Sequence, residues 1–416
     1  MELKRVVVTG MGAITPIGNS VKEYWDGLVN GVSGAKPITR FDATNFKTKF
    51  ACEVKGFNPE DYLDRKEVRK TDLFAQFAIA ASEQAIQDSG LNLEKIDLDE
   101  SGVIWGAGIG GIITFMEEVK GFVQGNGTPR FSPFFIPKMI TDIAAGLISM
   151  RYGFRGPNYA TVSACASSTH AISDAYNLIR LGKGKVFVTG GSEAAINEAG
   201  VGGFNSLQAL STRNDDPSTA SRPFDKDRDG FVIGEGAGAI ILEEYEHAVN
   251  RGARIYCEIR GTGMTADAYH LTAPHPEGLG ARKVMEAALK DGNIDPSEVD
   301  YINVHGTATP LGDIAETKAI IEVFGDHSYK MNISSTKSMT GHLLGGTGAI
   351  EAIASILAIQ NGIVPPTINH FTADPGLDPK LNLTFNKAQK RAVRVALSNT
   401  FGFGGHNACV ILKAFE

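Results

Sequence analysis

Apolar residues recur along the chain in short runs, and most of these runs end on glycine. β-Branched residues dominate the runs, and a glycine boundary is typical of a strand that enters a turn. We therefore expect a strand at each run. The runs span residues 5–10, 102–108, 185–191, 238–244, 254–261, 301–306 and 408–413.

Helical patterns separate several of these runs. Between residues 73 and 86, apolar side chains return with a period of about 3.6 residues, and Gly90 is placed to end that helix. A second helix is expected between Asp313, as its N-cap, and Gly325, as its C-terminal stop. The alternation of strands and helices predicts an α/β fold with largely parallel sheets.

The order of elements repeats once along the chain. Residues 85–108 resemble residues 288–308, because each segment contains a helix end, an acidic connector and an apolar strand that closes on glycine. Residues 170–182 resemble residues 348–362, and the two pairs follow in the same order. The repeat predicts two similar halves.

The 416 residues are enough for two such halves, which we place at residues 1–250 and 251–416. Hydrophobic residues make up 43% and charged residues 21%, a composition that excludes wholesale disorder. The net charge of −7 argues against a general affinity for nucleic acid, which needs a surplus of Lys and Arg. We see no secretory signal and no apolar stretch long enough for membrane insertion, so we expect a cytoplasmic protein.

Two motifs resemble ligand-binding loops but lack parts of them. GAGIGG at residues 106–111 follows a strand, as a dinucleotide loop does, yet the acidic residue expected about 20 positions later is missing. Residues 225–235 begin like a calcium loop, but the closing Glu comes one place early and glycines follow it. We expect neither loop to bind a nucleotide or a metal.

Cys165 lies where a β-like run meets a helix-forming run, between small residues. A sharp strand-to-helix turn would place its sulfur at the positive end of the helix dipole, which lowers a thiol pKa and favours the reactive thiolate. The alternative is a small buried thiol, as most free cysteines are. Cys52, Cys257 and Cys409 lie in strand-like or loop settings without metal-ligand spacing, so we expect them to be packing residues.

Two histidines occur in settings that resemble each other. His305 and His342 each follow a strand-like run and precede a glycine-rich turn. Ligand sites in such sheets lie beyond the carboxyl ends of the strands, so we expect both rings to converge with Cys165 on one face. Lys337 precedes His342 closely, where its amine would orient the imidazole and add positive charge.

One thiol, two imidazoles and no metal favour a particular chemistry. A protease-like pair needs one base and an orienting Asn or Asp. Two N–H donors aimed at one oxygen instead suit the enolate that forms when a malonyl thioester loses carbon dioxide. We therefore predict a decarboxylative condensation in which the thiolate first takes an acyl group. The amide of Phe403, in a glycine loop, would join that of Cys165 in an oxyanion hole.

These motifs together resemble those of the β-ketoacyl-[acyl-carrier-protein] synthases, and those of the type II enzymes most of all. The resemblance implies elongation of fatty acids by a thiolase-like fold. In that fold two pseudo-symmetric halves form an αβαβα layered sandwich, usually as a homodimer. The matching segments are VVVTGMGAITPIG, GIGG, VSACASS, STRND, SRPFDKDRDGFVIGEGA, VHGTATPLGD, STKSMTGHLLGGTGA and NTFGFGGHN.

The resemblance also implies a role for each matching residue. Cys165 would accept the acyl group, and His305 and His342 would support decarboxylation and stabilise the enolate. Lys337 would position His342, and Phe403 would gate the acyl pocket. The residues expected to bind substrate are Thr307, Thr309, Ile109, Phe204, His270 and Thr272. The buried acidic supports are expected to be Asp313, Glu316 and Glu351.

The partner implied by the resemblance is an acidic acyl-carrier protein, which brings the substrate on its 4'-phosphopantetheine arm. No permanently bound cofactor or metal is implied. An anionic enzyme needs a local basic patch for such a partner. Gln208 stands where the family often has arginine, and His406 stands where threonine is more usual. The patch is expected at Lys66, Arg69, Lys70 and Arg130.

Several related functions remain as alternatives. A type I fatty-acid synthase or a polyketide ketosynthase would share the fold, although Ile109 in the GIGG turn favours the type II enzyme. A non-catalytic chain-length subunit would lack the nucleophile. A thiolase would need a second cysteine at the C-terminal glycine turn, whereas Cys409 lies within the following strand run.

Overall fold

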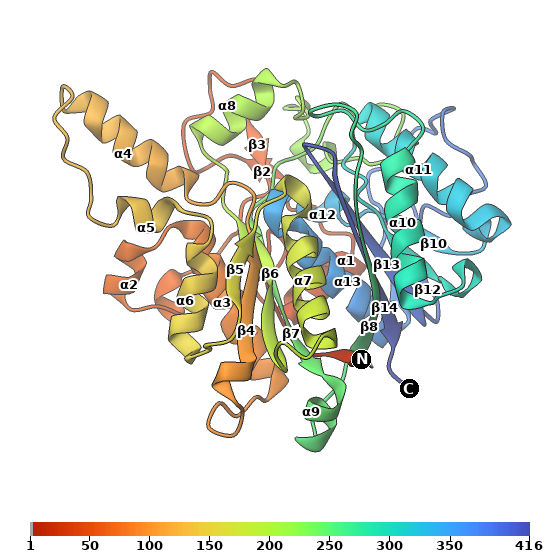
Figure 1. Cartoon of the computed structure of the whole chain (residues 1–416). Helices are drawn as coiled ribbons and strands as arrows, with labels where there is room; N and C mark the ends of the chain where they lie inside the picture. The colour runs from red at the N-terminus through yellow and green to blue at the C-terminus, as the bar shows by residue number, and fades with distance from the viewer. Residues whose placement is uncertain (1–2) are drawn as a thin grey trace.

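A ten-stranded mixed sheet forms the centre of the computed structural model, which describes residues 3–416 (Figure 1). Across this sheet the strand order is β10-β9-β13-β14-β8-β1-β7-β6-β4-β5. The strands are β1 (Val6–Ile14), β4 (Ser101–Gly106), β5 (Asn158–Thr161), β6 (Val186–Glu193), β7 (Gly236–Glu244), β8 (Cys257–Ala266), β9 (Tyr301–Asn303), β10 (Asn332–Ser334), β13 (Val395–Gly402) and β14 (His406–Ala414). Two small sheets pair β2 (Lys36–Pro37) with β3 (Phe50–Ala51) and β11 (Ile363–Val364) with β12 (Gln389–Lys390).

Each of the apolar runs predicted to be a strand overlaps a strand of this sheet. β13 was not predicted, and β5 and β10 were anticipated only as the strand-like runs that precede Cys165 and His342. β5 and β10 are short. Polar residues interrupt the apolar pattern of each strand: Asn158 in β5, Asn332 in β10 and Ser398 in β13. Hydrogen bonding to a neighbouring strand, rather than local apolar patterning, places these segments in the sheet.

The two halves of the sheet have the same topology. From edge to centre, β5-β4-β6-β7-β1 pair parallel, parallel, antiparallel and antiparallel, and β10-β9-β13-β14-β8 repeat that sequence of pairings. An antiparallel contact between β1 and β8 joins the halves. The strands of the first repeat end at Glu244, and those of the second begin at Cys257. The pseudo-symmetry predicted from the sequence is therefore present.

The expectation of largely parallel sheets is wrong, because the central strands of each half run antiparallel. Parallel neighbours need a long crossover, usually a helix. β13 and β14 are joined only by residues 403–405, so the chain reverses directly. Parallel pairing is confined to the outer strands of each half, where helices supply the crossovers.

Helices form three layers around the two halves of the sheet. α7 and α13 pack between the halves and against each other, whereas α3 and α10 cover the outer faces (Figure 1). This arrangement is the αβαβα sandwich expected from the resemblance. The helices are α1 (Val21–Val29), α2 (Arg65–Lys70), α3 (Leu73–Ser89), α4 (Ile112–Gln124), α5 (Phe135–Met139), α6 (Ile143–Tyr152), α7 (Ser167–Arg180), α8 (Glu198–Ser206), α9 (Tyr245–Asn250), α10 (Leu279–Gly292), α11 (Pro310–Phe324), α12 (Lys337–Thr340) and α13 (Thr347–Asn361).

The contact between α7 and α13 is close because small residues meet there. A Cβ atom on Gly348 of α13 would collide with the hydroxyl of Thr169 in α7. The hydroxyl of Ser168 also accepts a hydrogen bond from the backbone N–H of Ala349, at 3.1 Å. The first turns of the two inner helices therefore touch, and they bring the segments that precede both helices together.

The predicted helix ends are partly correct. α3 ends at Gly90, which is left-handed as expected, and α11 ends at Gly325, whose φ is 52°. However, α11 begins at Pro310, so Asp313 lies inside its first turn and is not its N-cap. Asp313 is instead fully buried, and its carboxylate accepts a hydrogen bond from the backbone N–H of Phe224 at 2.8 Å.

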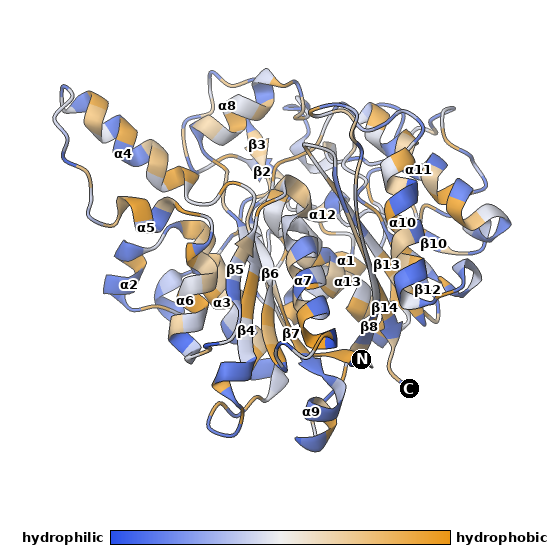
Figure 2. Ribbon diagram, viewed as in Figure 1, coloured by the Kyte–Doolittle hydropathy of each residue, from blue (hydrophilic) through white to orange (hydrophobic). Residues whose placement is uncertain are grey.

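Hydrophobic colouring follows the same layers. In Figure 2 the orange residues concentrate on strands such as β4 and β7, whereas the outlying helix α9 is largely blue. Within residues 3–416 we find no helix with the length and apolar character that a membrane crossing requires.

Candidate active site

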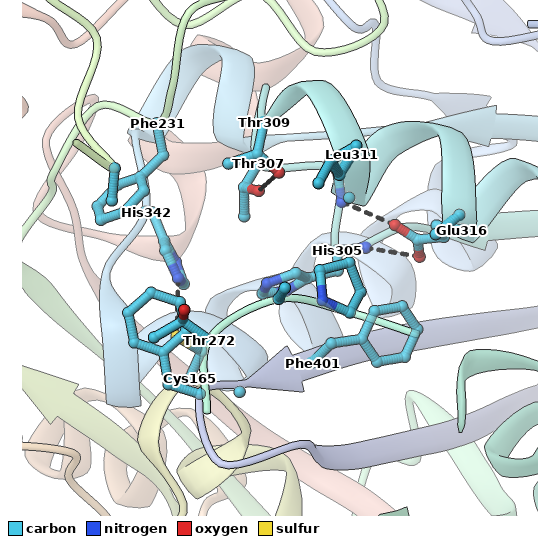
Figure 3. A pocket seen from close by; sticks show the side chains of 18 of the residues that line it. Cys165, Phe231, Thr272, His305, Thr307, Thr309, Leu311, Glu316, His342 and Phe401 are labelled. Atoms are coloured by element: carbon cyan, nitrogen blue, oxygen red, sulfur yellow. Dashed lines mark hydrogen bonds between the residues drawn. The ribbon is translucent and has the colours of Figure 1, made fainter. Parts of the chain in front are cut away.

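A cavity of about 460 Å³ lies between the two halves and contains the predicted catalytic residues. Cys165, His305 and His342 line its buried end, and Figure 3 shows their side chains close together. Leu311, which is 68% exposed, lines the outer end. The site therefore combines one residue from the first half with two from the second, as predicted.

Cys165 lies in a tight turn between β5 and α7. The turn, residues 164–166, is a short 3-10 helix that leads directly into α7. Ala164 has a φ of 49°, a left-handed conformation that a large or branched side chain disfavours. The sulfur lies 3.0 Å from Nε2 of His342. The strand-to-helix turn predicted from the sequence is thus present.

The predicted lowering of the Cys165 pKa is wrong. Burial raises the pKa of this thiol to about 12, while the charge of Lys337 and the backbone N–H groups of Phe403 and Cys165 act in the opposite direction. Removal of water from around the sulfur outweighs these favourable contacts. The resting group is therefore a neutral thiol, whose proton must leave before the sulfur can act as a nucleophile.

His342 is placed to receive that proton. Burial and the charge of Lys337 hold its pKa well below the usual range, so the ring is neutral. Its Nδ1 lies 2.9 Å from the hydroxyl of Thr347, at the first residue of α13. A hydroxyl both donates and accepts, so Thr347 supports the tautomer that accepts a proton at Nε2 and the tautomer that donates one there.

His305 follows β9 and faces the same space. Its ring is nearly perpendicular to that of His342, with centroids 5.3 Å apart. The backbone N–H groups of His305 and Gly306 donate to the carboxylate of Glu316, both at 2.9 Å, and this contact fixes the turn. Burial, the charge of Lys337 and His342 hold the pKa of His305 well below its ordinary value. Both imidazoles are therefore uncharged.

Lys337 is buried and pairs with Glu351 through a short ionic hydrogen bond. Within the described residues, Lys337 has no hydrogen bond to the ring of His342, so it does not hold that ring directly. It acts through its charge, which lowers the pKa of the thiol and of both imidazoles.

The three predicted acidic supports are all buried. Burial raises the pKa of Glu351 to about 7 and that of Glu316 to about 7, against the charge of Lys337 and their hydrogen bonds. Burial also raises the pKa of Asp313 to about 6, although the Arg228 guanidinium lies 3.3 Å away. Asp313 and Glu316 accept hydrogen bonds from backbone N–H groups, and Glu351 pairs with Lys337. None of the three is in hydrogen-bond contact with Cys165.

Phe403 lies in the turn between β13 and β14, beside the nucleophile. Its ring lines the cavity, with its centroid 6.4 Å from that of Phe204. Gly402, just before it, approaches the turn of Cys165 so closely that a Cβ atom would lie 3.1 Å from the Cys165 nitrogen. The amides of Phe403 and Cys165 both interact with the sulfur, so they lie beside it, and the oxyanion hole stays a prediction.

The predicted substrate-binding residues divide into two groups. Thr307, Thr309, Thr272 and Phe204 line the cavity, and the hydroxyls of Thr307 and Thr309 lie 3.2 Å apart (Figure 3). His270 does not line the cavity. It is exposed, and its Nδ1 accepts the backbone N–H of Thr272 and of Ala273, because the chain turns there.

Ile109 is likewise not a lining residue of the cavity. It is partly buried, in an apolar cluster with Phe204 and Leu344, which do line the cavity. Gln208, one of the two departures from the family pattern, lines the cavity in a left-handed conformation with φ of 54°. His406, the other departure, is exposed at the start of β14, beside Gly404.

The predicted basic patch is on the surface. Lys66, Arg69 and Lys70 are exposed on α2, and Arg130 is exposed in the loop between α4 and α5. The amine of Lys70 lies 5.4 Å from the centre of the Phe134 ring. In Figure 1, α2 lies on the opposite side of the molecule from α11.

Sequence reasoning missed three residues of the site. Thr347 holds His342, the ring of Phe231 lies 5.3 Å from that of His342, and the ring of Phe401 lies 5.5 Å from that of His305. The position of Thr347 at the start of a helix was the only local signal. The two aromatic residues come from distant segments, and although Phe231 and Phe401 lie within the quoted motifs, nothing in the sequence shows that their rings meet these histidines.

Comparison with known proteins places the chain in a family. Residues 3–248 match the family model for the N-terminal domain of beta-ketoacyl synthase, and residues 256–371 match the model for its C-terminal domain. The chain belongs to the beta-ketoacyl synthase family. The resemblance drawn from the motifs, the thiolase-like fold and the assignment as a condensing acyltransferase are confirmed.

Full-length relatives of this beta-ketoacyl synthase are named 3-oxoacyl-[acyl-carrier-protein] synthase 2. The protein of that name from Synechocystis sp. is 52% identical over 418 residues, covering 100% of this chain and 99% of that protein. The one from Coxiella burnetii is 48% identical over 413 residues, covering 99% of each.

Solved structures of ketosynthases share the fold. A beta-ketoacyl synthase from Burkholderia phymatum has a TM-score of 0.92 and 35% identity, covering 99% of this chain and 100% of that chain. A type II polyketide ketosynthase, solved with its acyl-carrier protein and a bound hexaketide, has a TM-score of 0.90 and 34% identity, with 100% of each chain covered.

The buried charge of Lys337 gives a testable effect on Cys165. In Lys337→Met, loss of the ammonium removes the field that stabilises the thiolate, so the pKa of Cys165 rises. We expect the rate of Cys165 alkylation by iodoacetamide, followed by mass spectrometry, to increase only at higher pH than in the unmodified protein. Lys183→Met, at an exposed lysine, is the control. An unchanged pH profile in Lys337→Met would show that its charge does not reach the sulfur.

Proposed function

We propose that this chain catalyses two successive steps at Cys165, first acyl transfer and then decarboxylative condensation. The observation that carries the proposal is the 3.0 Å contact of the sulfur with His342 Nε2, beside the perpendicular ring of His305, at the buried end of one cavity. The overall reaction joins an acyl group to malonyl-acyl-carrier protein in fatty acid elongation.

In the first step the sulfur of Cys165 attacks the thioester of an acyl-carrier protein. The thiol proton passes to Nε2 of His342 and then to the departing pantetheine thiolate. The amides of Phe403 and Cys165 stabilise the tetrahedral oxyanion. The thioester bond to the carrier breaks, and a thioester bond to Cys165 forms.

In the second step a malonyl thioester enters the emptied part of the cavity. Its carboxylate leaves as carbon dioxide, and the electron pair of that bond moves into an enolate. Nε2–H groups of His305 and His342 donate to the enolate oxygen, as neutral rings in a buried site are able to do. The enolate carbon attacks the acyl carbon on Cys165, and the carbon–sulfur bond breaks with its electron pair on sulfur. β-Ketoacyl-acyl-carrier protein is released, and the Cys165 thiolate takes up one proton from solvent to return to the neutral thiol.

The 4'-phosphopantetheine arm enters with the carrier protein, and the enzyme keeps no cofactor of its own. The hydroxyls of Thr307 and Thr309, at the outer part of the cavity, are placed to bind the amides of that arm.

We also propose that the halves act as the units 1–250 and 251–416, because each supplies part of the site. A cytoplasmic location remains a prediction.

Substitutions at Cys165 and His342 test the roles assigned to these two residues. Cys165→Ala should abolish formation of the acyl-enzyme and all condensation, whereas His342→Ala should lower the rate of carbon dioxide release by about 10²–10³, as for a lost oxyanion donor. The assay mixes purified enzyme with acyl- and malonyl-carrier protein and measures carbon dioxide and ketoacyl product. Tyr152→Phe, on α6 outside the cavity, is the control. Condensation by Cys165→Ala would refute the nucleophile assignment.

The basic patch of Lys66, Arg69, Lys70 and Arg130 is proposed to attract the carrier protein. Reversing the charge of Lys66, Arg69 and Lys70 to Glu should raise KM for malonyl-carrier protein by about tenfold at low salt. It should not change KM for a malonyl-pantetheine substrate that lacks the protein. Lys183, Lys290 and Lys330, three exposed lysines elsewhere, provide a matched triple Glu variant. Equal effects of the two triple variants on KM would argue against a specific patch.

We further propose a homodimer formed through β5. Among residues 3–416 this strand is the edge of the sheet and pairs only with β4. Tyr159, within the strand, and Val162, just after it, are 40% and 58% exposed. An open apolar edge favours pairing with a second copy. The arm of α4 and α5, where the ribbon in Figure 2 is partly orange, also has exposed apolar side chains, namely Phe115, Val123, Phe131, Phe134 and Ile136.

Sedimentation analysis tests the dimer. The 44.3 kDa chain should sediment with twice its mass, and the double variant Tyr159→Asp, Val162→Asp should sediment as a monomer because buried charge at the edge opposes pairing. Val249→Asp, at an exposed valine on α9, is the matched control and should remain a dimer. A monomeric unmodified chain, or an unaffected double variant, would contradict pairing through β5.

A polyketide ketosynthase is the second candidate function, because solved ketosynthases of that class share the fold at 34% identity. The full-length relatives near 50% identity favour the fatty acid enzyme. Product analysis distinguishes the two, since one round of condensation on saturated acyl chains indicates elongation of fatty acids.

A further inference from the structure

Glu193 is a buried carboxylate that the mechanism above does not use. It is the last residue of β6, it is fully buried, and it does not line the cavity. Its oxygens accept backbone N–H groups from Gly108 at 2.8 Å, from Ile109 and Gly110 at 3.1 Å, and from Gly345 at 3.1 Å. Four donors thus converge on one side chain.

These donors come from two turns in opposite halves of the molecule. Residues 108–110 follow β4, and Gly345 lies between His342 and the start of α13. The two turns touch directly, because a Cβ atom on Gly345 would collide with the backbone nitrogen of Gly108. A carboxylate with two acceptor oxygens is therefore the group that holds both turns together.

The carboxylate of Glu193 also explains why the GAGIGG motif is not free to bind an external anion. Consecutive backbone N–H groups that point to one place form a cradle for an anion such as phosphate. In this chain the amides of residues 108–110 are occupied by Glu193. The motif therefore binds an internal carboxyl group, that of Glu193, whose position is fixed at the end of β6.

The turn of residues 108–110, which Glu193 holds, supports part of the cavity wall. Ile109 packs in the apolar cluster that contains Phe204 and Leu344, and these two residues face the cavity beside Cys165. Leu344 directly precedes Gly345, so the same carboxylate fixes the wall from both sides. A displacement of either turn would move Ile109, Leu344 or both.

We propose that Glu193 is a positioning residue that limits which acyl chains the condensing site accepts. It does so by clamping the turn of Ile109 to the turn that follows His342. The inference rests on the proposed function, since it assigns the cavity to the acyl chain. The carboxylate acts through Ile109 and Leu344 and does not touch the reacting atoms.

The variant Glu193→Gln tests the clamp. The amide group presents N–H donors to backbone N–H donors, so part of the set of hydrogen bonds is lost while side-chain volume is kept. We expect the ratio of kcat/KM for a long saturated acyl-carrier protein to that for a short one to rise about tenfold, because a loosened wall admits longer chains. Glu53→Gln is the matched control. Glu53 is buried and also accepts backbone N–H groups, at Thr39 and Arg40, outside the cavity.

A double-mutant cycle distinguishes positioning from general loss of structure. Ile109→Ala alone should also raise the ratio, and adding Glu193→Gln to it should have little further effect, because both changes act on the same wall. Additive effects, or a ratio that stays within twofold of the unmodified enzyme, would overturn the proposal. Where Glu193→Gln does not fold, Glu193→Asp is measured in the same cycle, since its shorter carboxylate cannot reach both turns.

The short-chain substrate separates this proposal from the proposed function. If the unmodified enzyme condenses neither chain, the proposed function fails. If it condenses both chains and the ratio does not change in the variants, only the role of Glu193 fails.

Discussion

The contact between the first turns of α7 and α13 is the constraint on which the site depends. Each inner helix follows a tight turn, and each turn carries or follows a residue of the candidate site, Cys165 in one half and His342 in the other. Small residues such as Gly348 allow the helices to approach. A separation of a few ångströms would break the contact between sulfur and imidazole, so packing at the core sets the geometry of the chemistry.

Burial determines the charge state of the site. It raises the pKa of the thiol and of the supporting carboxyl groups, and it lowers the pKa of both imidazoles. Lys337, paired with Glu351, is the positive charge that acts on all of them. Neutral rings suit an enolate, because they donate N–H groups without protonating the carbon that must attack. The apolar surroundings strengthen each of these hydrogen bonds.

The sequence alone was sufficient for features that depend on local pattern. The apolar runs predicted strands such as β1 and β6, Gly90 predicted the end of α3, and the turn at Cys165 was recognisable from its small neighbours. Features that depend on distant segments were not predictable. The high pKa of Cys165 reflects burial by both halves, and the antiparallel pairing of β13 follows from its return into β14. His270 was expected in the cavity, but a local turn directs it to the surface.

The tight turns before α7 and α13 are equivalent in the two repeats, since Ala164 and Leu344 share a φ of 49° and precede their helices by the same spacing. The counterpart of the nucleophile is therefore Gly345. Its backbone lies against Gly108, leaving no room for a side chain. One of the two equivalent turns carries the sulfur of Cys165, whereas the other has a glycine at the same place and packs against the segment that follows β4. The internal symmetry of the fold therefore does not extend to a second thiol at this position.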